Sequence, residues 1–195
     1  MSEVADNTEL VFLLDKVKQG DRKSFDKLYL NIYSKMYNFA LTKVIEGTAE
    51  EVVNDAMMQV WLKAKTFKGE SKVTTWIYGI VNVLCLKTYQ KNSALKRSSV
   101  VYMDSDSREL ASQSDEINME DRIIALDKME TLVAELSEEH RCAILLIAEG
   151  MTYEEISQIE GCPVNTAKTR VFNARRILRD KLKDHQKLEE PHYET

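Results

Sequence analysis

The stretch MTYEEISQIEGCPVNTAKTRVFNARRILRDKLK, residues 151–183, decides how the last part of the chain folds. Thr152 and Glu155 have the spacing of a capping box, in which each side chain binds a backbone amide at the start of a helix. A Gly-Cys-Pro tripeptide at 161–163 then breaks the helical pattern. These residues predict a short helix, a tight turn and a longer helix.

Apolar residues in the longer helix recur every three or four positions, which is typical of a helix that buries one face. Its segment 164–183 also carries seven basic residues against a single acidic one. Two helices joined by a tight turn, the second of them basic, indicate a helix-turn-helix whose second helix enters the major groove of DNA. The alternative is a helical hairpin with an ordinary solvated charged face.

The outward face of this second helix supplies the candidate DNA contacts. Amide and hydroxyl side chains bind base edges, whereas Lys and Arg bind bases or phosphates. The predicted contacts are Asn165, Thr166, Lys168, Thr169, Arg170, Asn173, Arg175 and Arg176.

The composition of the 195-residue chain favours a globular, helical protein, because 44% of its residues are hydrophobic and it has only six Gly and two Pro. No apolar run approaches the roughly 18–20 residues of a membrane span, and the first residues do not resemble a secretory signal. The three cysteines form no CxxC pair, so we predict neither a disulfide framework nor a metal site. We expect no cofactor, no membrane insertion and a cytoplasmic location.

The formal net charge of −5 argues at first against binding nucleic acid, but the charge is segregated along the chain. Residues 1–98 have a net charge of +4, residues 99–122 a net charge of −5, and residues 123–195 a net charge of −4. The basic segment 164–183 is therefore a localised positive field inside an acidic region, and such a distribution matters more for binding than the total.

Residues 99–122 are rich in Ser, Asp and Glu without helical periodicity, which indicates a linker; an acidic surface loop is the alternative. The predicted fold class is all-α, with two small helical domains joined by a flexible acidic linker. The predicted boundaries are 10–97 for the first domain, 98–122 for the linker, 123–184 for the second domain and 185–195 for a disordered tail.

In the first domain, the helical patterns cover residues 24–43 and a second stretch that begins at Thr48, where Thr48 and Glu51 predict another capping box. The face of the second helix opposite its apolar stripe carries Met58 and Leu62 in line with acidic residues. Two apolar residues on an acidic face suggest a partner site. The alternative is that both are simply half-buried.

A glycine-centred loop at 66–72 precedes the third helix of this domain. Basic residues alternate with aromatic ones here, which is what binding of single-stranded DNA requires, since cations bind phosphates and aromatic rings stack on bases. Many ordinary surface helices carry the same residues. The residues concerned are Lys72, Trp76, Lys87, Tyr89 and Lys91.

Four segments in order resemble the extracytoplasmic-function (ECF) sigma factors, the small subunits that direct bacterial RNA polymerase to promoters. GDRKSFDKLYLNIYSKMYNFAL (20–41) resembles the first helix of sigma domain 2, and AEEVVNDAMMQVWLKAKTF (49–67) the helix that docks on the polymerase clamp. FKGESKVTTWIYGIVN (67–82) is similar to the promoter-melting segment. Residues 135–182 are similar to sigma domain 4.

The resemblance implies a non-enzymatic initiation subunit whose partners are the clamp and flap of core RNA polymerase, promoter DNA, and an anti-sigma factor or another recruiting protein. Domain 4 would read the −35 element, and the linker would thread the polymerase cleft. The implied polymerase-binding residues are Glu51, Asp55, Met58, Gln59 and Leu62. The implied contacts to the −10 element, where one base is flipped into the loop, are Phe67, Lys68, Gly69, Lys72, Trp76, Asn82 and Lys87.

The chain departs from the family pattern at DNA-reading positions. Where the family has TWLYRIARN, this chain has TWIYGIVNV, so Gly79 replaces an Arg and Val83 replaces an Asn. In the recognition helix, Asn165 replaces a Gly, Ala167 a Val and Asn173 an Arg. A lost bidentate base contact removes roughly 1–3 kcal/mol of discrimination. We therefore predict weakened or atypical promoter readout, with delivery by another DNA-bound protein.

The competing function is a helix-turn-helix regulator that binds duplex DNA without polymerase. Such a protein would give a footprint on its own and would form no stable complex with core polymerase. An enzyme has little support, because the sequence has no nucleophile–base set, glycine-rich phosphate loop or metal cluster.

Overall fold

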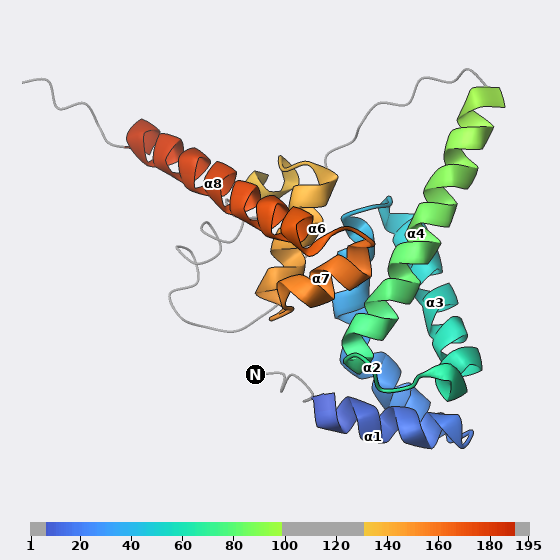
Figure 1. Ribbon diagram of the computed structural model, residues 1–195. Helices are drawn as coiled ribbons and strands as arrows, with labels where there is room; N and C mark the ends of the chain where they lie inside the picture. The colour runs from blue at the N-terminus through green and yellow to red at the C-terminus, as the bar shows by residue number, and fades with distance from the viewer. Residues whose placement is uncertain (1–6, 99–130, 190–195) are drawn as a thin grey trace, which may run out of the picture.

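The computed structural model describes residues 7–98 and 131–189, and within these ranges it contains helices and no strands (Figure 1). The all-α prediction is therefore confirmed. The first part of the chain forms α1 (Asn7–Lys18), α2 (Arg22–Leu41), α3 (Glu46–Lys63), the 3-10 turn η1 (Ala64–Thr66) and α4 (Val73–Ser98). Residues 131–134 are helical, and α6 (Glu138–Ala148), α7 (Tyr153–Glu160) and α8 (Val164–Glu189) follow.

The expected apolar stripes form the core of the first part. Val52, Val53, Ala56 and Met57 of α3 are buried against α2 and α4. Helix α1, which the sequence patterns did not identify, adds four buried residues, Leu10, Leu13, Leu14 and Val17. It also holds the start of α4, because the Val73 amide donates to the Asn7 side-chain oxygen at 3.1 Å.

The predicted capping box of α3 is wrong, whereas that of α7 is confirmed. Helix α3 begins at Glu46, and the Ile45 carbonyl already accepts from the Ala49 amide at 2.8 Å, so Thr48 lies inside the first turn. Helix α8 continues to Glu189, so residues 185–189 are helical rather than disordered. The predicted linker from residue 99 and residues 190–195 lie outside the described residues.

The two halves of the chain pack against each other. Helix α7 lies against α4 and α6 approaches α2, while α8 extends away from α4 (Figure 1). One continuous buried cluster includes Phe39, Ile77 and Val81 from the first half and Leu146 and Ile156 from the second. The sequence alone predicted two separate helical units and gave no sign of this shared core.

Candidate nucleic-acid interface

Helix α8, the predicted recognition helix, is positioned by local signals. The Thr152 hydroxyl accepts from the Glu155 amide at 3.2 Å, and the Glu155 carboxylate accepts from the Thr152 amide at 2.8 Å. Gly161 ends α7 in the left-handed conformation, with φ of +64°, which glycine adopts without strain. Buried Ala167, Val171, Ala174 and Leu178 then fix which face of α8 is turned outward.

Most of the predicted −35 contacts lie on that outward face. Asn165, Lys168, Thr169, Arg175 and Arg176 are exposed, while Thr166 and Asn173 are half-buried. Arg170 is placed differently, since its guanidinium donates to the Glu160 carboxylate at 3.2 Å. The outward face also carries Phe172, which is 68% exposed. Sequence reasoning missed Phe172, although an aromatic residue outside the apolar stripe of a basic helix was the available signal.

We expect Lys168→Ala to lower the slope of log affinity against log salt for −35 duplex DNA by about 0.9, because one phosphate contact is lost. Arg170→Ala should change the slope less, because Glu160 already neutralises that guanidinium. Fluorescence anisotropy of the polymerase-bound protein across a salt series measures both slopes. An unchanged slope for Lys168→Ala would remove it from the phosphate contacts.

The glycine-centred loop is held in place by aromatic contacts. The Phe67 and Trp76 rings have centroids 5.2 Å apart, and the Lys18 ammonium of α1 lies 5.5 Å from the centre of the Phe67 ring. Gly69 has a φ of +77°, which favours glycine at the loop tip. Lys68, Gly69 and Lys87 are exposed. The loop and the adjoining part of α4 therefore present cations and a partly open aromatic pair.

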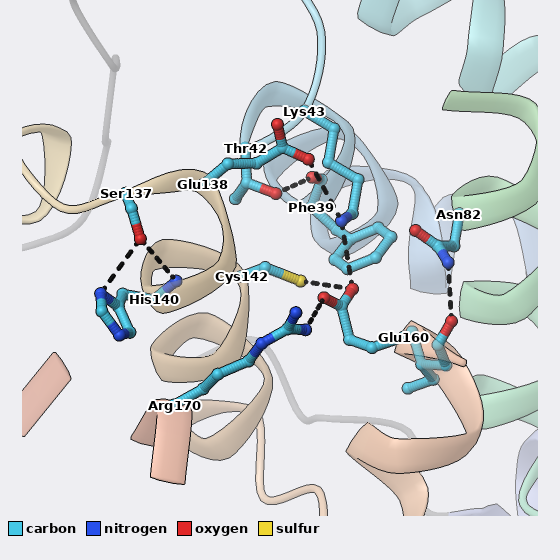
Figure 2. Close-up of polar contacts among 11 residues, drawn as sticks. Phe39, Thr42, Lys43, Asn82, Ser137, Glu138, His140, Cys142, Glu160 and Arg170 are labelled. Carbon is cyan, nitrogen blue, oxygen red and sulfur yellow. Dashed lines mark hydrogen bonds and ion pairs between the residues drawn. The ribbon is translucent and has the colours of Figure 1, made fainter. Parts of the chain in front are cut away.

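Asn82 is not on this open surface. It is 5% exposed, and its side-chain amide donates to the Ile159 carbonyl of α7 at 2.7 Å (Figure 2). Lys72 also reaches α7, where it pairs with Glu155 at 3.1 Å. Two of the residues that we predicted to contact the −10 element are thus engaged by the other half of the chain.

A groove of about 450 Å³ lies beside Gly79. No atom lies within 4 Å of the place where a Cβ on Gly79 would sit, apart from its own helix and neighbours, so the missing side chain leaves open space. Apolar atoms make up the larger part of the groove surface, and several polar side chains also line it. The lining consists of Gln59, Lys63, Ser71, Thr75, Trp76, Gly79, Ile80, Val83, Leu84, Lys87 and Gln158.

The acidic stripe on α3 is open to solvent at four of its five residues. Met58 and Leu62 are 58% and 65% exposed, so they are not merely half-buried. Glu51 and Asp55 are exposed and Gln59 is half-buried. A second groove, of about 390 Å³, adjoins Met58 and is formed by α2 and α3 together; Phe25, Tyr29 and Trp61 contribute to it. The sequence could not show this groove because its walls come from two helices.

Glu160 is the centre of a buried polar cluster between the two halves (Figure 2). Its carboxylate accepts from the Lys43 ammonium at 3.1 Å, from the Arg170 guanidinium and from the Cys142 thiol at 2.9 Å. Burial by itself lowers the pKa of Lys43, but the neighbouring carboxylates of Glu160 and Glu138 more than offset it, so the pKa lies above its usual value. Burial raises the pKa of the Cys142 thiol well above its usual value, so it stays protonated as a donor.

The described residues contain no helix that is both long and apolar enough to cross a membrane. Within the same ranges, no group of three or more His, Cys, Asp or Glu side chains has the arrangement of a metal site.

Comparison with known proteins identifies the family. Residues 28–94 match the model of sigma-70 region 2, and residues 126–178 match that of sigma-70 region 4. The ECF RNA polymerase sigma-E factor of Escherichia coli K12 is 28% identical over 176 residues, covering 87% of this chain and 92% of the relative. That of Haemophilus influenzae is 26% identical over 177 residues, covering 87% of this chain and 93% of the relative.

Two solved structures are also similar. The sigma factor RpoE from Bartonella quintana, in complex with the anti-sigma factor NepR, matches with a TM-score of 0.66 and 28% identity, covering 83% of this chain and 98% of that one. CnrH, in complex with the cytosolic domain of CnrY, shares the fold with a TM-score of 0.61 at 17% identity, covering 92% of this chain and 99% of that one. Both halves thus match sigma-70 regions in the expected order, and the chain is an ECF sigma factor of the sigma-70 family that directs transcription initiation by RNA polymerase.

Proposed function

We propose that this sigma factor docks on the polymerase clamp through the stripe formed by Glu51, Asp55, Met58, Gln59 and Leu62. The observation that carries the proposal is the exposure of Met58 and Leu62 beside two exposed carboxylates and an apolar groove. Large apolar side chains that remain open to water in this way are typical of a partner site.

The two proposed promoter contacts bind DNA in different forms. Helix α8 reads the −35 element as duplex DNA through its exposed face, where Phe172 is placed to contact a thymine methyl group. The loop around Gly69 receives a flipped base of the −10 element. Flipping costs a few kcal/mol, and stacking on aromatic rings recovers roughly 1–3 kcal/mol per base.

We propose the wider setting by analogy with the family. The proposed domain division is 10–97 and 123–184, with an acidic linker through the polymerase cleft. The factor works in the cytoplasm without catalysing a reaction of its own. The RpoE structure contains an anti-sigma factor, and an anti-sigma factor or a recruiting protein is accordingly proposed to restrain or deliver this chain.

The atypical part of the proposed promoter readout lies at Gly79 and Val83. At these positions the family pattern supplies polar side chains, whereas here they line a mainly apolar groove. The −10 strand then lacks the Arg and Asn side chains that the family pattern places at these two positions. We propose that this makes −10 recognition weak and dependent on a second DNA-bound protein.

We expect Gly79→Arg to strengthen initiation at this factor's own promoters by about 10-fold, since one good polar base contact is worth roughly 1–3 kcal/mol. Space for the side chain is available, because nothing lies within 4 Å of the added Cβ. The measurement is run-off transcription with reconstituted holoenzyme, and Gly79→Leu, which fills the same groove without a polar group, is the control. Transcription by the Gly79→Arg factor that is equal to or lower than that of the unsubstituted factor would contradict weak readout at this position.

The decisive experiment for the whole function is reconstitution with core polymerase, followed by mapping of transcript start sites. Holoenzyme formation and starts downstream of a shared two-part sequence are expected. A polymerase-independent regulator would instead give a footprint alone and no holoenzyme. Strong initiation by holoenzyme alone from one well-defined promoter would remove the need for a recruiting protein.

A further inference from the structure

Helix α1 contacts both the 3-10 turn before the glycine-centred loop and helix α4 after it (Figure 1). Near its start, the Asn7 side-chain oxygen accepts from the Val73 amide at 3.1 Å, where α4 begins. At its other end, the Lys18 ammonium lies 5.5 Å from the centre of the Phe67 ring. Four buried apolar residues hold α1 against the core, so both contacts have a fixed geometry.

The Lys18 side chain places a positive charge that water can reach at the proposed base site. It is 29% exposed, and its ammonium is paired with the Asp15 carboxylate at 2.8 Å. The Asp15 side chain is itself 54% exposed, and an ion pair on an open helix surface is weak and screened by salt. Because an ammonium has three donors, a DNA strand at the loop can bind it beside Asp15 or in place of Asp15.

A nucleotide that stacks on Phe67 brings its phosphates close to this ammonium. A flipped base turns about its own backbone, so the phosphates on either side of it remain next to the pocket. A lysine binds a phosphate oxygen as a point charge, and such a charged hydrogen bond is stronger than a neutral one. The Trp76 ring also contacts Phe67, with centroids 5.2 Å apart, so two aromatic rings and one cation meet at the same place.

We propose that Lys18 is a further contact to the −10 element, in which its ammonium binds a phosphate next to the flipped base. This inference rests on the proposed function of the loop around Gly69 in receiving that base. Lys18 lies on α1, before the first of the four segments that resemble the family, so the resemblance did not point to it. It adds a positive charge to a site where Gly79 stands in the place of an Arg.

Lys16 is a matched control within the same turn of α1. Both lysines lie in the last turn, so both interact favourably with the helix dipole. Both also lie near a phenylalanine ring, since the Lys16 ammonium is 5.6 Å from the centre of the Phe12 ring. Phe12 belongs to α1 itself, however, and residues two apart in a helix point to different sides. Removing either charge changes the net charge equally, but of the two it is Lys18 that faces the loop.

The test compares Lys18→Met, Lys18→Arg and Lys16→Met as full-length proteins in reconstituted holoenzyme. Methionine keeps the helix propensity and unbranched shape of lysine without its charge. The probe is fluorescein-labelled fork-junction DNA taken from a mapped start site of this factor, in which the non-template −10 strand is single-stranded. Anisotropy across a salt series gives the affinity, and the melting temperature of each free protein checks its fold.

Lys18→Met should lower the slope of log affinity against log salt by about 0.7, the value for one phosphate contact to a single strand. Its affinity deficit relative to the parent should therefore shrink about threefold between about 50 and 200 mM salt. A neutral methylphosphonate linkage next to the flipped base should weaken binding of the parent and have no further effect on Lys18→Met. Lys18→Arg should restore both properties, and Lys16→Met should behave like the parent.

An equal change of slope in Lys16→Met and Lys18→Met would overturn the Lys18 contact, as would a methylphosphonate effect that persists in Lys18→Met. Lys68→Met removes an exposed cation of the loop itself and tests the assignment on which the contact rests. Unchanged slopes in both Lys68→Met and Lys18→Met would overturn the −10 role of the loop together with the Lys18 contact. Failure of the parent to form holoenzyme would count against the sigma function itself.

A second variant covers the case in which Lys18→Met does not fold. Asp15→Asn leaves the lysine in place and removes the carboxylate that competes with DNA for its ammonium. This variant should bind the probe more tightly than Glu9→Gln, which makes an equal charge change at an exposed position of the same helix. Equal binding by Asp15→Asn and Glu9→Gln would show that Lys18 makes no contact with the strand.

Discussion

The substitution Met58→Asp is expected to reduce the affinity for core polymerase by at least about 30-fold, the loss of 2 kcal/mol or more that marks a hot-spot residue. Met58 is 58% exposed and borders the apolar groove between α2 and α3. On docking, the introduced carboxylate would lose its water in an apolar setting, without a partner from the neighbouring Asp55 or Glu51. Binding of labelled protein to core polymerase measures the change.

The same substitution should leave the free protein intact, because a side chain that is open to water contributes little to folding; the free energy of unfolding is expected to change by no more than about 0.5 kcal/mol. Leu30→Asp is the matched control. Leu30 is also an exposed apolar residue, but it lies on α2 outside the stripe and the groove. Normal polymerase binding by Met58→Asp, or an equal loss with Leu30→Asp, would mean that the stripe is ordinary surface.

The largest expected effect on stability is that of Phe39→Ala. Phe39 is fully buried, and its ring packs edge-to-face on Tyr78 with centroids 5.0 Å apart, where α2 and α4 meet the second half of the chain. Phe→Ala in a core costs about 3–5 kcal/mol, a large part of the 5–15 kcal/mol that a domain typically has. Urea unfolding followed by circular dichroism measures the loss.

Phe12→Ala is the control for this prediction because it removes the same ring from an exposed position on α1. Its only ring contact described is with Lys16, whose ammonium lies 5.6 Å from the ring centre. The expected change is below about 1 kcal/mol. Equal losses from the two substitutions would contradict the central place of Phe39 in the shared core.

Local signals in the sequence were sufficient to predict those parts of the structure that depend on contacts between residues close together in the chain. The capping box at Thr152 and Glu155, the glycine stop at Gly161 and the apolar stripe of α8 predicted the helix-turn-helix correctly, because each depends on contacts within a few residues. The prediction of a capping box at Thr48 was wrong because the spacing of two residues does not show where the helix begins. Its spacing is right, but a helix that starts two residues earlier leaves no free amide for Thr48 to cap.

The residue pattern was enough to predict the all-helical class, the order of the two sigma regions and the outward faces of α3 and α8. The contact of Asn82 with Ile159, the pairing of Arg170 with Glu160 and the groove at Gly79 became visible only in the folded chain. Helical periodicity records which side of a helix is buried, but not which distant segment covers it. The partner of a buried amide or charge is fixed by packing between helices, and here that packing brings α7 against Lys72 and Asn82 of the first half.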